Sequence, residues 1–188
     1  MSELSISNSQ DSVKSLGHPS MSISDYMVAF SGQTKSYCVG IIDMIDSTKI
    51  SARLPVGKLS RYYQIFLNSM ADTLKKFGGK AIKNVGDSLL FFFPESCKGR
   101  KYGFMSCLEG GLGMTELHDH LCLCAKNEGL PCINYRISCD YGSVVLMQSS
   151  DSSVDMIGPP LNMCAKINRF AQDNGIVIGA DLYEMVKK

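Results

Sequence analysis

Two aspartates lie where a binding site for divalent cations could form. Asp43 ends an apolar run that begins at residue 37, and Asp87 follows a glycine between two short runs, 80–85 and 88–93. A Gly-Asp pair between two such runs predicts a tight β-hairpin with the Asp87 carboxylate at its tip. If these strands are neighbours in one sheet, the two carboxylates converge and attract Mg²⁺ or Mn²⁺, ions that bring phosphates with them. Alternatively, both are ordinary turn residues, because Asp satisfies local backbone donors.

The residues after Asp43 predict a helix start, with Ser47 or Thr48 as the N-cap. The backbone N–H groups of Ile45, Asp46, Ser47 and Thr48 would point outward there. Together with the helix dipole, they would form a phosphate-binding turn beside a metal ligand. The alternative is a plain capped helix.

Lys83 is flanked by apolar residues on a predicted half-buried strand. Strand alternation places it on the same face as Ala81 and Val85. A lysine in that position either extends to solvent or meets an acidic partner. Asp155, on the approach to the last long helix, is the candidate partner.

A polar stripe on that later helix offers further contacts. Asn162, Lys166 and Arg169 are spaced i, i+4 and i+7 on a helix expected at 161–171. Such a stripe is usually a solvated helix face. The functional alternative is a row of donors directed at ribose and phosphate oxygens, and helical spacing alone does not decide between the two.

Two His-Cys pairs follow one another in a segment expected to be helical. His118 and Cys122 are i,i+4 neighbours, and so are His120 and Cys124. The pairs point in directions roughly 200° apart at ~100° per residue. Because a single four-ligand zinc site is hard to build from them, a partly buried helix is the preferred interpretation.

Composition indicates one globular domain. The chain has 188 residues, 45% of them apolar, and a net charge of +1, which argues against a nucleic-acid-binding surface. No run approaches the ~20 apolar residues of a membrane span, and no signal peptide is recognised, so we expect a cytoplasmic protein. Eight cysteines are expected to be reduced, buried apolar residues, without a disulfide framework: Cys38, Cys97, Cys107, Cys122, Cys124, Cys132, Cys139 and Cys164.

The order of the expected elements indicates an α+β fold. Residues 1–30 are serine-rich and predicted to be a disordered tail, followed by one domain over 36–188. The remaining pattern predicts a mainly antiparallel sheet with helices on one face. Its elements are a strand at 37–43, a short helix, a helix at 58–77, a hairpin at 80–93, one glycine-weakened helix at about 101–127, a hairpin at 134–147, a helix at 161–171, a strand at 176–178 and a helix at 181–188.

Four segments in this order resemble the class III nucleotidyl cyclases, the family that makes cyclic AMP or cyclic GMP. They are residues 42–48 (IDMIDST), 79–87 (GKAIKNVGD), 135–142 (YRISCDYG) and 155–162 (DMIGPPLN). The resemblance runs from about residue 37 to residue 179. It implies a ferredoxin-like α+β sandwich similar to polymerase palm domains.

The resemblance also implies roles for the residues singled out above. Asp43 and Asp87 would hold two divalent cations, Mg²⁺ or Mn²⁺, assisted by the backbone carbonyl of Met44. Lys83 and Asp155 would read the base, and a Lys-Asp pair is the adenine-type choice in this family. A lysine donor suits adenine N1, and an aspartate acceptor suits the N6 amino group.

Further along the chain, Asn162 would orient the ribose and Lys166 would stabilise charge on the phosphoryl group. The family usually has Arg at the Lys166 position, and Arg offers a planar fork where Lys offers a point charge. Asp46 stands where Gly is common. The family fold continues after its last helix into a β-hairpin with another phosphate-binding lysine, and the sequence ends at Lys188, before such an element.

The implied activity is conversion of ATP to 3′,5′-cyclic AMP and pyrophosphate, with GTP as the alternative substrate. In this family the active site forms between two head-to-tail protomers, so a homodimer would have two sites. The alternative is a cyclase-like module with little or no turnover that binds nucleotide or dimerises. A third reading is a scaffold of this fold that binds no nucleotide.

Overall fold

The structure, a computed structural model, describes residues 28–149 and 154–187, with side chains from 34 to 147 and from 155 to 187. The strands are β1 (Val28–Met44), β2 (Lys80–Val85), β3 (Ser88–Phe93), β4 (Tyr135–Ser149), β5 (Val154–Ile157) and β6 (Ile176–Ile178). The helices are α1 (Ser47–Ser51), α2 (Val56–Lys76), α3 (Lys101–Thr115), α4 (His118–Asn127), α5 (Pro159–Ile167) and α6 (Ala180–Val186), with short 3₁₀ segments η2 (Pro94–Lys98) and η3 (Asn168–Phe170).

The first strand begins earlier than the sequence predicted. The predicted tail at 1–30 lies outside the described residues except for 28–30, which belong to β1. These residues join the sheet because the first half of β1 pairs with the last part of β4, from Val28 opposite Ser149 onward. The domain therefore includes residues before 36.

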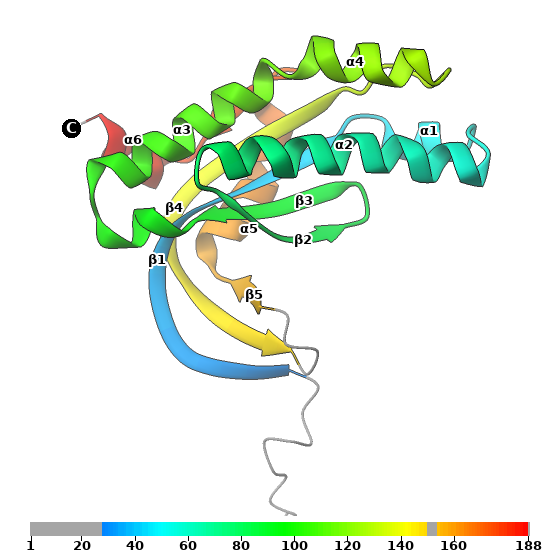
Figure 1. Cartoon of the computed structure of the whole chain (residues 1–188). Coiled ribbons are helices and arrows are strands. Elements are labelled where there is room, and N and C mark those ends of the chain that lie inside the picture. Colours follow the sequence, from blue (N-terminus) through cyan, green and yellow to red (C-terminus); the bar gives the residue numbers. More distant parts are fainter. Residues whose placement is uncertain (1–27, 150–153, 188) are drawn as a thin grey trace, which may run out of the picture.

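The strands form one curled, mainly antiparallel sheet in the order β2-β3-β1-β4-β5, and β6 adds to β4 in the parallel direction. The central strand of this order is β1, which pairs with β3 on one side and β4 on the other. The curl brings β2 and β5, at opposite ends of this order, into contact (Figure 1). The predicted α+β class is confirmed.

Helices cover both faces of the sheet, whereas the sequence predicted helices on one face. Alternate β1 residues explain the two layers: Cys38 and Ile42 belong to the larger core under α2, α3, α4 and α6. Tyr37 and Val39 belong to a smaller core that includes Leu161 of α5. Figure 1 shows α2, α3 and α4 on one side of the strands and α5 on the other. The sequence prediction missed the helix on the second face of the sheet, because α5 covers only part of that face.

The predicted helix at about 101–127 is two helices, α3 and α4, separated at residues 116–117. Glycines in α3 allow close packing. A Cβ atom on Gly113 would lie 2.7 Å from the Phe77 ring, and one on Gly110 would lie 2.8 Å from the Phe93 ring. These glycines therefore bring helix and core together, which offsets their low helix propensity.

The cysteine prediction is partly wrong. Four cysteines are buried and free, as expected: Cys38, Cys107, Cys139 and Cys164. Cys97 is free but exposed, and Cys122 and Cys132 are joined by a disulfide. The disulfide was missed because the sequence places its two cysteines in different elements, α4 and the loop before β4. Folding brings that loop back against the helix.

Candidate functional site

The end of β1 brings the acidic groups together, as the hairpin prediction requires. Asp43 lies opposite Ser88 of β3, and the Ser88 hydroxyl donates a hydrogen bond to the Asp43 carboxylate. Asp87 precedes Ser88 in the two-residue turn between β2 and β3, where Gly86 has a φ of 61°. The hairpin is confirmed, with Gly supplying the left-handed conformation that its first turn position needs.

The environment of Asp43 is suited to a cation. Burial raises the pKa of Asp43, and the nearby charge of Asp87 raises it further. The Ser88 hydrogen bond and the Arg136 charge oppose this shift. A partly buried carboxylate whose pKa is raised by burial and by a neighbouring negative charge is stabilised when a divalent cation replaces the proton. The donor set therefore fits Mg²⁺ or Mn²⁺. The Met44 side chain is buried in the core, which leaves its backbone carbonyl as its only possible ligand.

We expect the variant Ser88→Ala to move cation binding to higher pH. The substitution removes the Ser88 hydroxyl, whose hydrogen bond lowers the pKa of Asp43. The Asp43 carboxyl group therefore keeps its proton to a higher pH. Because a cation binds the deprotonated form, affinity should fall earlier as the pH is lowered. Isothermal titration with Mn²⁺ over a pH series measures this, with Ser60→Ala, an exposed serine on α2, as the control. Overlapping pH profiles for the two variants would contradict the assignment of Asp43.

The turn after β1 differs from the predicted phosphate-binding turn. The N-cap of α1 is Asp46, with φ 56°, and neither Ser47 nor Thr48 caps the helix. The Ile45 N–H is already bonded to the Asn134 carbonyl at 2.8 Å. Only the N–H groups that follow Ile45 are left to face a ligand, and α1 is five residues long, so its dipole contribution is small.

Asp46 occupies the left-handed conformation that favours glycine, which gives a physical reason for the glycine that is common there in the resembling family. We expect Asp46→Gly to stabilise the fold by roughly 0.7 kcal/mol, because relief of about 1 kcal/mol of left-handed backbone strain exceeds the ~0.3 kcal/mol of an exposed ion pair. The pair that is lost joins Lys49 Nζ to Asp46 Oδ1 at 2.8 Å. Thermal unfolding measures the effect. Asp46→Ala keeps the strain and loses the pair, so it should unfold at a lower temperature than the wild type, and the reverse order would contradict this account.

Lys83 meets the partner that the sequence suggested. Its ammonium group forms an ion pair with the Asp155 carboxylate, which joins β2 to β5 across the curl of the sheet. The Asp155 carboxylate also accepts the Met156 N–H at 2.8 Å, which fixes its orientation. The predicted alternation holds for Lys83 and Val85, which lie on the same face of β2. It does not extend to Ala81, because a register shift lies between Ala81 and Lys83.

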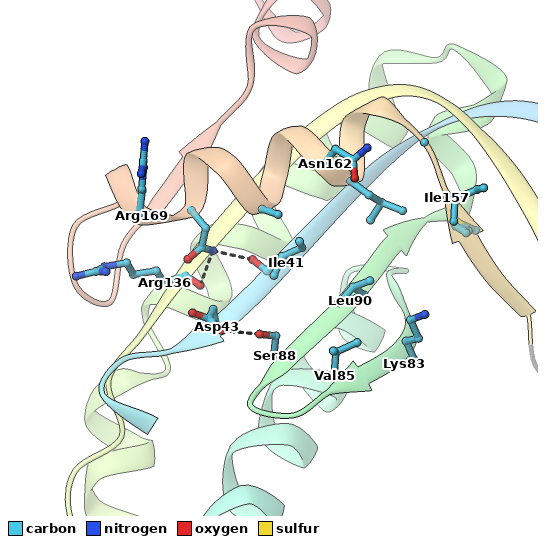
Figure 2. A pocket seen from close by; sticks show the side chains of 15 residues that line it. Ile41, Asp43, Lys83, Val85, Ser88, Leu90, Arg136, Ile157, Asn162 and Arg169 are labelled. Carbon is cyan, nitrogen blue, oxygen red and sulfur yellow. Dashed lines mark hydrogen bonds between the residues drawn. The ribbon is translucent and has the colours of Figure 1, made fainter. Parts of the chain in front are cut away.

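A cavity of about 740 Å³ opens between the sheet and α5. This volume lies within the usual range for small-molecule sites. Figure 2 shows Asp43 and Arg136 toward one end and Lys83 toward the other. The lining residues are Ile41, Asp43, Lys83, Val85, Ser88, Leu90, Arg136, Met156, Ile157, Gly158, Leu161, Asn162, Ala165, Asn168 and Arg169. Asp87 and Asp155 lie next to lining residues and are not among them.

The polar stripe of α5 is divided by the structure. Asn162 and Arg169 line the cavity, whereas Lys166 is exposed and does not. The helix ends at Ile167 and continues as η3, so the predicted spacing does not hold to Arg169. In Figure 2 the Arg169 side chain points away from Asp43, and its guanidinium carbon lies 4.9 Å from the centre of the Phe170 ring.

Three polar residues of the cavity were missed by sequence reasoning: Ser88, Arg136 and Asn168. Arg136 lies opposite Asp43 in the sheet and forms an ion pair with Asp173, with Nη2 to Oδ1 at 2.6 Å. Asn168 is buried, and its amide nitrogen donates to the Ile41 and Arg136 carbonyls at 3.3 and 3.2 Å. The hairpin predicted at 134–147 is wrong, because these residues belong to one continuous strand, β4. A signal for Arg136 was still present, because alternation along the first predicted arm would have directed it to the same face as Ser138.

Comparison with solved structures identifies the fold. Similar structures include the adenylyl cyclase CyaB from P. aeruginosa, at 24% identity over 82% of this chain and 82% of that chain, with a TM-score of 0.73. The guanylyl cyclase Cya2 matches at 20% identity over 82% and 80%, with a TM-score of 0.68. The guanylate cyclase domain of RhGC from Catenaria anguillulae, in complex with GTP, matches at 18% identity over 82% and 84%, with a TM-score of 0.67. No protein-family model and no curated protein sequence matches the chain.

The chain therefore has the fold of class III adenylyl and guanylyl cyclase catalytic domains. Within the described residues, every helix is too short or too polar to cross a membrane.

Proposed function

We propose that this chain, with its class III cyclase fold, is a nucleotidyl cyclase that converts ATP to 3′,5′-cyclic AMP and pyrophosphate. One observation carries the proposal. A single cavity has Asp43, beside Asp87, toward one end and Lys83, paired with Asp155, toward the other. These are the two chemistries that a nucleoside triphosphate needs, anion neutralisation through a cation and recognition of a base. In a head-to-tail homodimer, the acidic end of one protomer's cavity would face the Lys83 end of its partner's, so that each nucleotide would use one end from each chain. A cytoplasmic location, where ATP is abundant, is part of the same proposal.

The proposed base-reading groups are Lys83 and Asp155. The ammonium group donates to adenine N1, and the carboxylate accepts a hydrogen from the N6 amino group. Their ion pair holds both groups in place before the base arrives, which reduces the entropy lost on binding. The similarity to both adenylyl and guanylyl cyclases does not select the base, so the choice of ATP rests on this pair.

Asp43 and Asp87, with the Met44 carbonyl, are the proposed ligands of two divalent cations, Mg²⁺ or Mn²⁺. When bound, such ions would lower the pKa of the ribose 3′-hydroxyl and neutralise charge on the phosphates. Asn162 lines the cavity, where its amide can orient the ribose. In the turn after β1, the backbone N–H groups of Asp46, Ser47 and Thr48 can contact phosphate oxygens.

A homodimer is part of the proposal. One protomer would supply Asp43 and Asp87, and its partner would supply Lys83, Asp155 and Asn162, together with Lys166 as the charge-stabilising group. Lys166 is exposed beside the cavity, so it is available to a substrate held between two chains. Catalysis would then consist mainly of positioning and charge neutralisation.

The alternative is a cyclase-like module that binds nucleotide or dimerises with little turnover. Lys166 in place of the usual arginine favours it, because a point charge replaces a bidentate donor.

The deciding experiment incubates purified protein with ATP or GTP and Mn²⁺ and measures cyclic product by mass spectrometry. Cyclic AMP formed by the wild type and lost in Asp43→Asn supports the enzyme. Tight binding of ATP without any cyclic product supports the module. Failure to bind either nucleotide in the presence of Mn²⁺ rejects both.

A further inference from the structure

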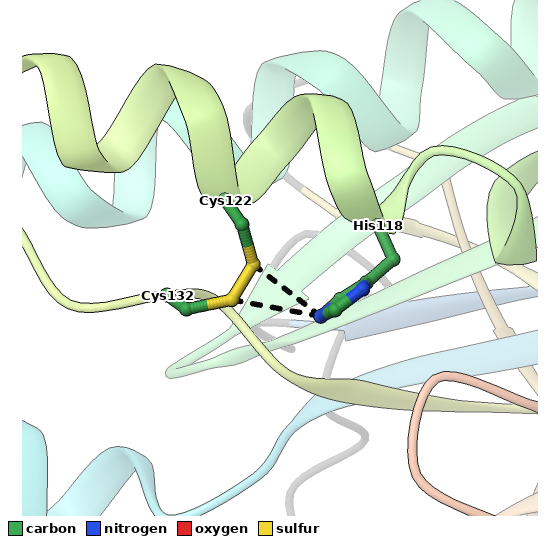
Figure 3. Close-up of side chains that lie close together, drawn as sticks. All are labelled: His118, Cys122 and Cys132. Atoms are coloured by element: carbon green, nitrogen blue, oxygen red, sulfur yellow. Dashed lines mark hydrogen bonds between the residues drawn. A yellow bond between two sulfur atoms is a disulfide. The ribbon is translucent and has the colours of Figure 1, made fainter.

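We propose that His118, Cys122 and Cys132 form a binding site for a soft divalent cation such as Zn²⁺ when the two cysteines are reduced. One donor atom from each residue lies within 4.8 Å of the other two, the closest such grouping of three His, Cys, Asp or Glu side chains in the described parts of the chain. The His118 Nε2 atom lies 3.3 Å from Cys122 Sγ and 3.6 Å from Cys132 Sγ (Figure 3). The site is distinct from the cavity described above.

Two elements bring these side chains together. His118 begins α4 and Cys122 lies one turn later, so their side chains share one face of the helix. Cys132 comes from the loop between α4 and β4. That loop is fixed at the cysteine and at the residue that follows it: the Tyr62 hydroxyl donates to the Cys132 carbonyl at 3.2 Å, and the neighbouring Ile133 is fully buried. The sulfur is therefore held against the helix by the backbone.

The imidazole of His118 is oriented for coordination. Its Nδ1 atom lies 3.4 Å from the Asp119 carboxylate, which leaves Nε2 directed at the sulfurs. A carboxylate on the other ring nitrogen is the usual support of a metal-binding histidine. The Asn134 side-chain oxygen lies 3.0 Å from the same Nε2 atom, and Cys132 is exposed, so an amide oxygen or water can complete four ligands. One imidazole and two thiolates are a donor set that zinc prefers.

The disulfide and the metal are alternative states of the same sulfurs. In the structure Cys122 and Cys132 are joined, and a disulfide offers no thiolate. A cellular dithiol of the thioredoxin class would supply two electrons and two protons, which break the S–S bond and leave two thiols while the dithiol becomes a disulfide. Zinc binding then releases the two thiol protons. Reoxidation of the pair by a small-molecule disulfide, which takes up two electrons and two protons and becomes two thiols, would re-form the S–S bond and expel the ion.

The same helix offers a matched control. His120 and Cys124 have the same i,i+4 spacing, with Nε2 to Sγ at 3.5 Å, but no third ligand within reach among the described residues. A two-ligand pair binds a cation much more weakly than a three-ligand site. Removing His120 or Cys124 should therefore leave zinc affinity unchanged.

The test is competition for Zn²⁺ between the reduced full chain and a chromophoric chelator, with Co²⁺ absorption as a second readout. We expect one equivalent of Zn²⁺, tetrahedral Co²⁺ bands with sulfur charge transfer, and at least a 100-fold loss of affinity in His118→Ala, Cys122→Ser and Cys132→Ser. Cys124→Ser should bind as the wild type does, and oxidised protein should not bind. Because Cys132 is exposed, its serine variant should fold, which circular dichroism checks.

Either of two results would overturn the proposal. Reduced wild type that binds Zn²⁺ no more tightly than Cys132→Ser would show that the three residues do not act together. Equal losses in Cys124→Ser and Cys122→Ser would show only non-specific thiol binding.

Discussion

The variant Asp87→Ala should lose Mn²⁺-dependent formation of cyclic nucleotide by at least about 100-fold, while it remains folded. The carboxylate lies at the tip of the β2–β3 turn, close enough to Asp43 for its charge to raise the pKa of that group. Removing one of two carboxylate ligands takes away charge that holds the cations, and a 100-fold loss corresponds to about 2.7 kcal/mol. Because the side chain is in a turn and only partly buried, the unfolding temperature should change little.

Initial rates from mass spectrometry, together with thermal unfolding, measure both effects. Asp72→Ala removes an exposed carboxylate on α2 and serves as the control for net charge. Turnover in Asp87→Ala equal to that of Asp72→Ala would remove Asp87 from the proposed metal site.

Replacing Lys83 with glutamate should weaken the use of ATP relative to GTP. The ammonium donor becomes an acceptor, which cannot serve adenine N1 but can accept the N1 and N2 hydrogens of guanine. We expect the ratio of ATP use to GTP use to fall by about 10-fold or more, in line with the ~1.4 kcal/mol that separates one good from one mismatched hydrogen bond. The new carboxylate would also face Asp155, which loses its ion pair.

Competition between ATP and GTP in the presence of Mn²⁺ measures this ratio. Lys80→Glu makes the same charge change on β2, outside the residues that line the cavity, and should not alter the ratio. An unchanged ratio in Lys83→Glu, or the same change in Lys80→Glu, would exclude Lys83 from base recognition.

The parts of the site that sequence could predict are those set by local pattern. The Gly86-Asp87 pair predicted the hairpin, because turn chemistry and strand length are written in adjacent residues. That Asp87 would lie near Asp43 was predicted only on the condition that their strands are neighbours, and the pairing of β1 with β3 meets that condition. The pairing of Lys83 with Asp155 was also predicted, although only the curl of the sheet brings these two strands together.

Features that depend on tertiary packing were predicted poorly. Asp46 adopts a positive φ that its residue type does not require, so Ser47 or Thr48 was the expected cap. The break in the predicted stripe before Arg169 follows from where α5 ends, and nothing in the periodicity marks that end. Cys132 meets Cys122 only because a buried loop residue holds the chain against α4.

Asn134 makes contacts that join two regions distant in sequence. Its carbonyl accepts the Ile45 N–H at 2.8 Å, in the turn after the acidic strand, and its side chain lies 3.0 Å from His118 Nε2. A ligand that draws His118 away from this amide therefore perturbs the residue that anchors the turn. If the perturbation changes nucleotide affinity by some factor, thermodynamic linkage requires nucleotide to change the affinity of the other ligand by the same factor. Measuring either affinity with the second ligand present would then report the coupling free energy between the two regions.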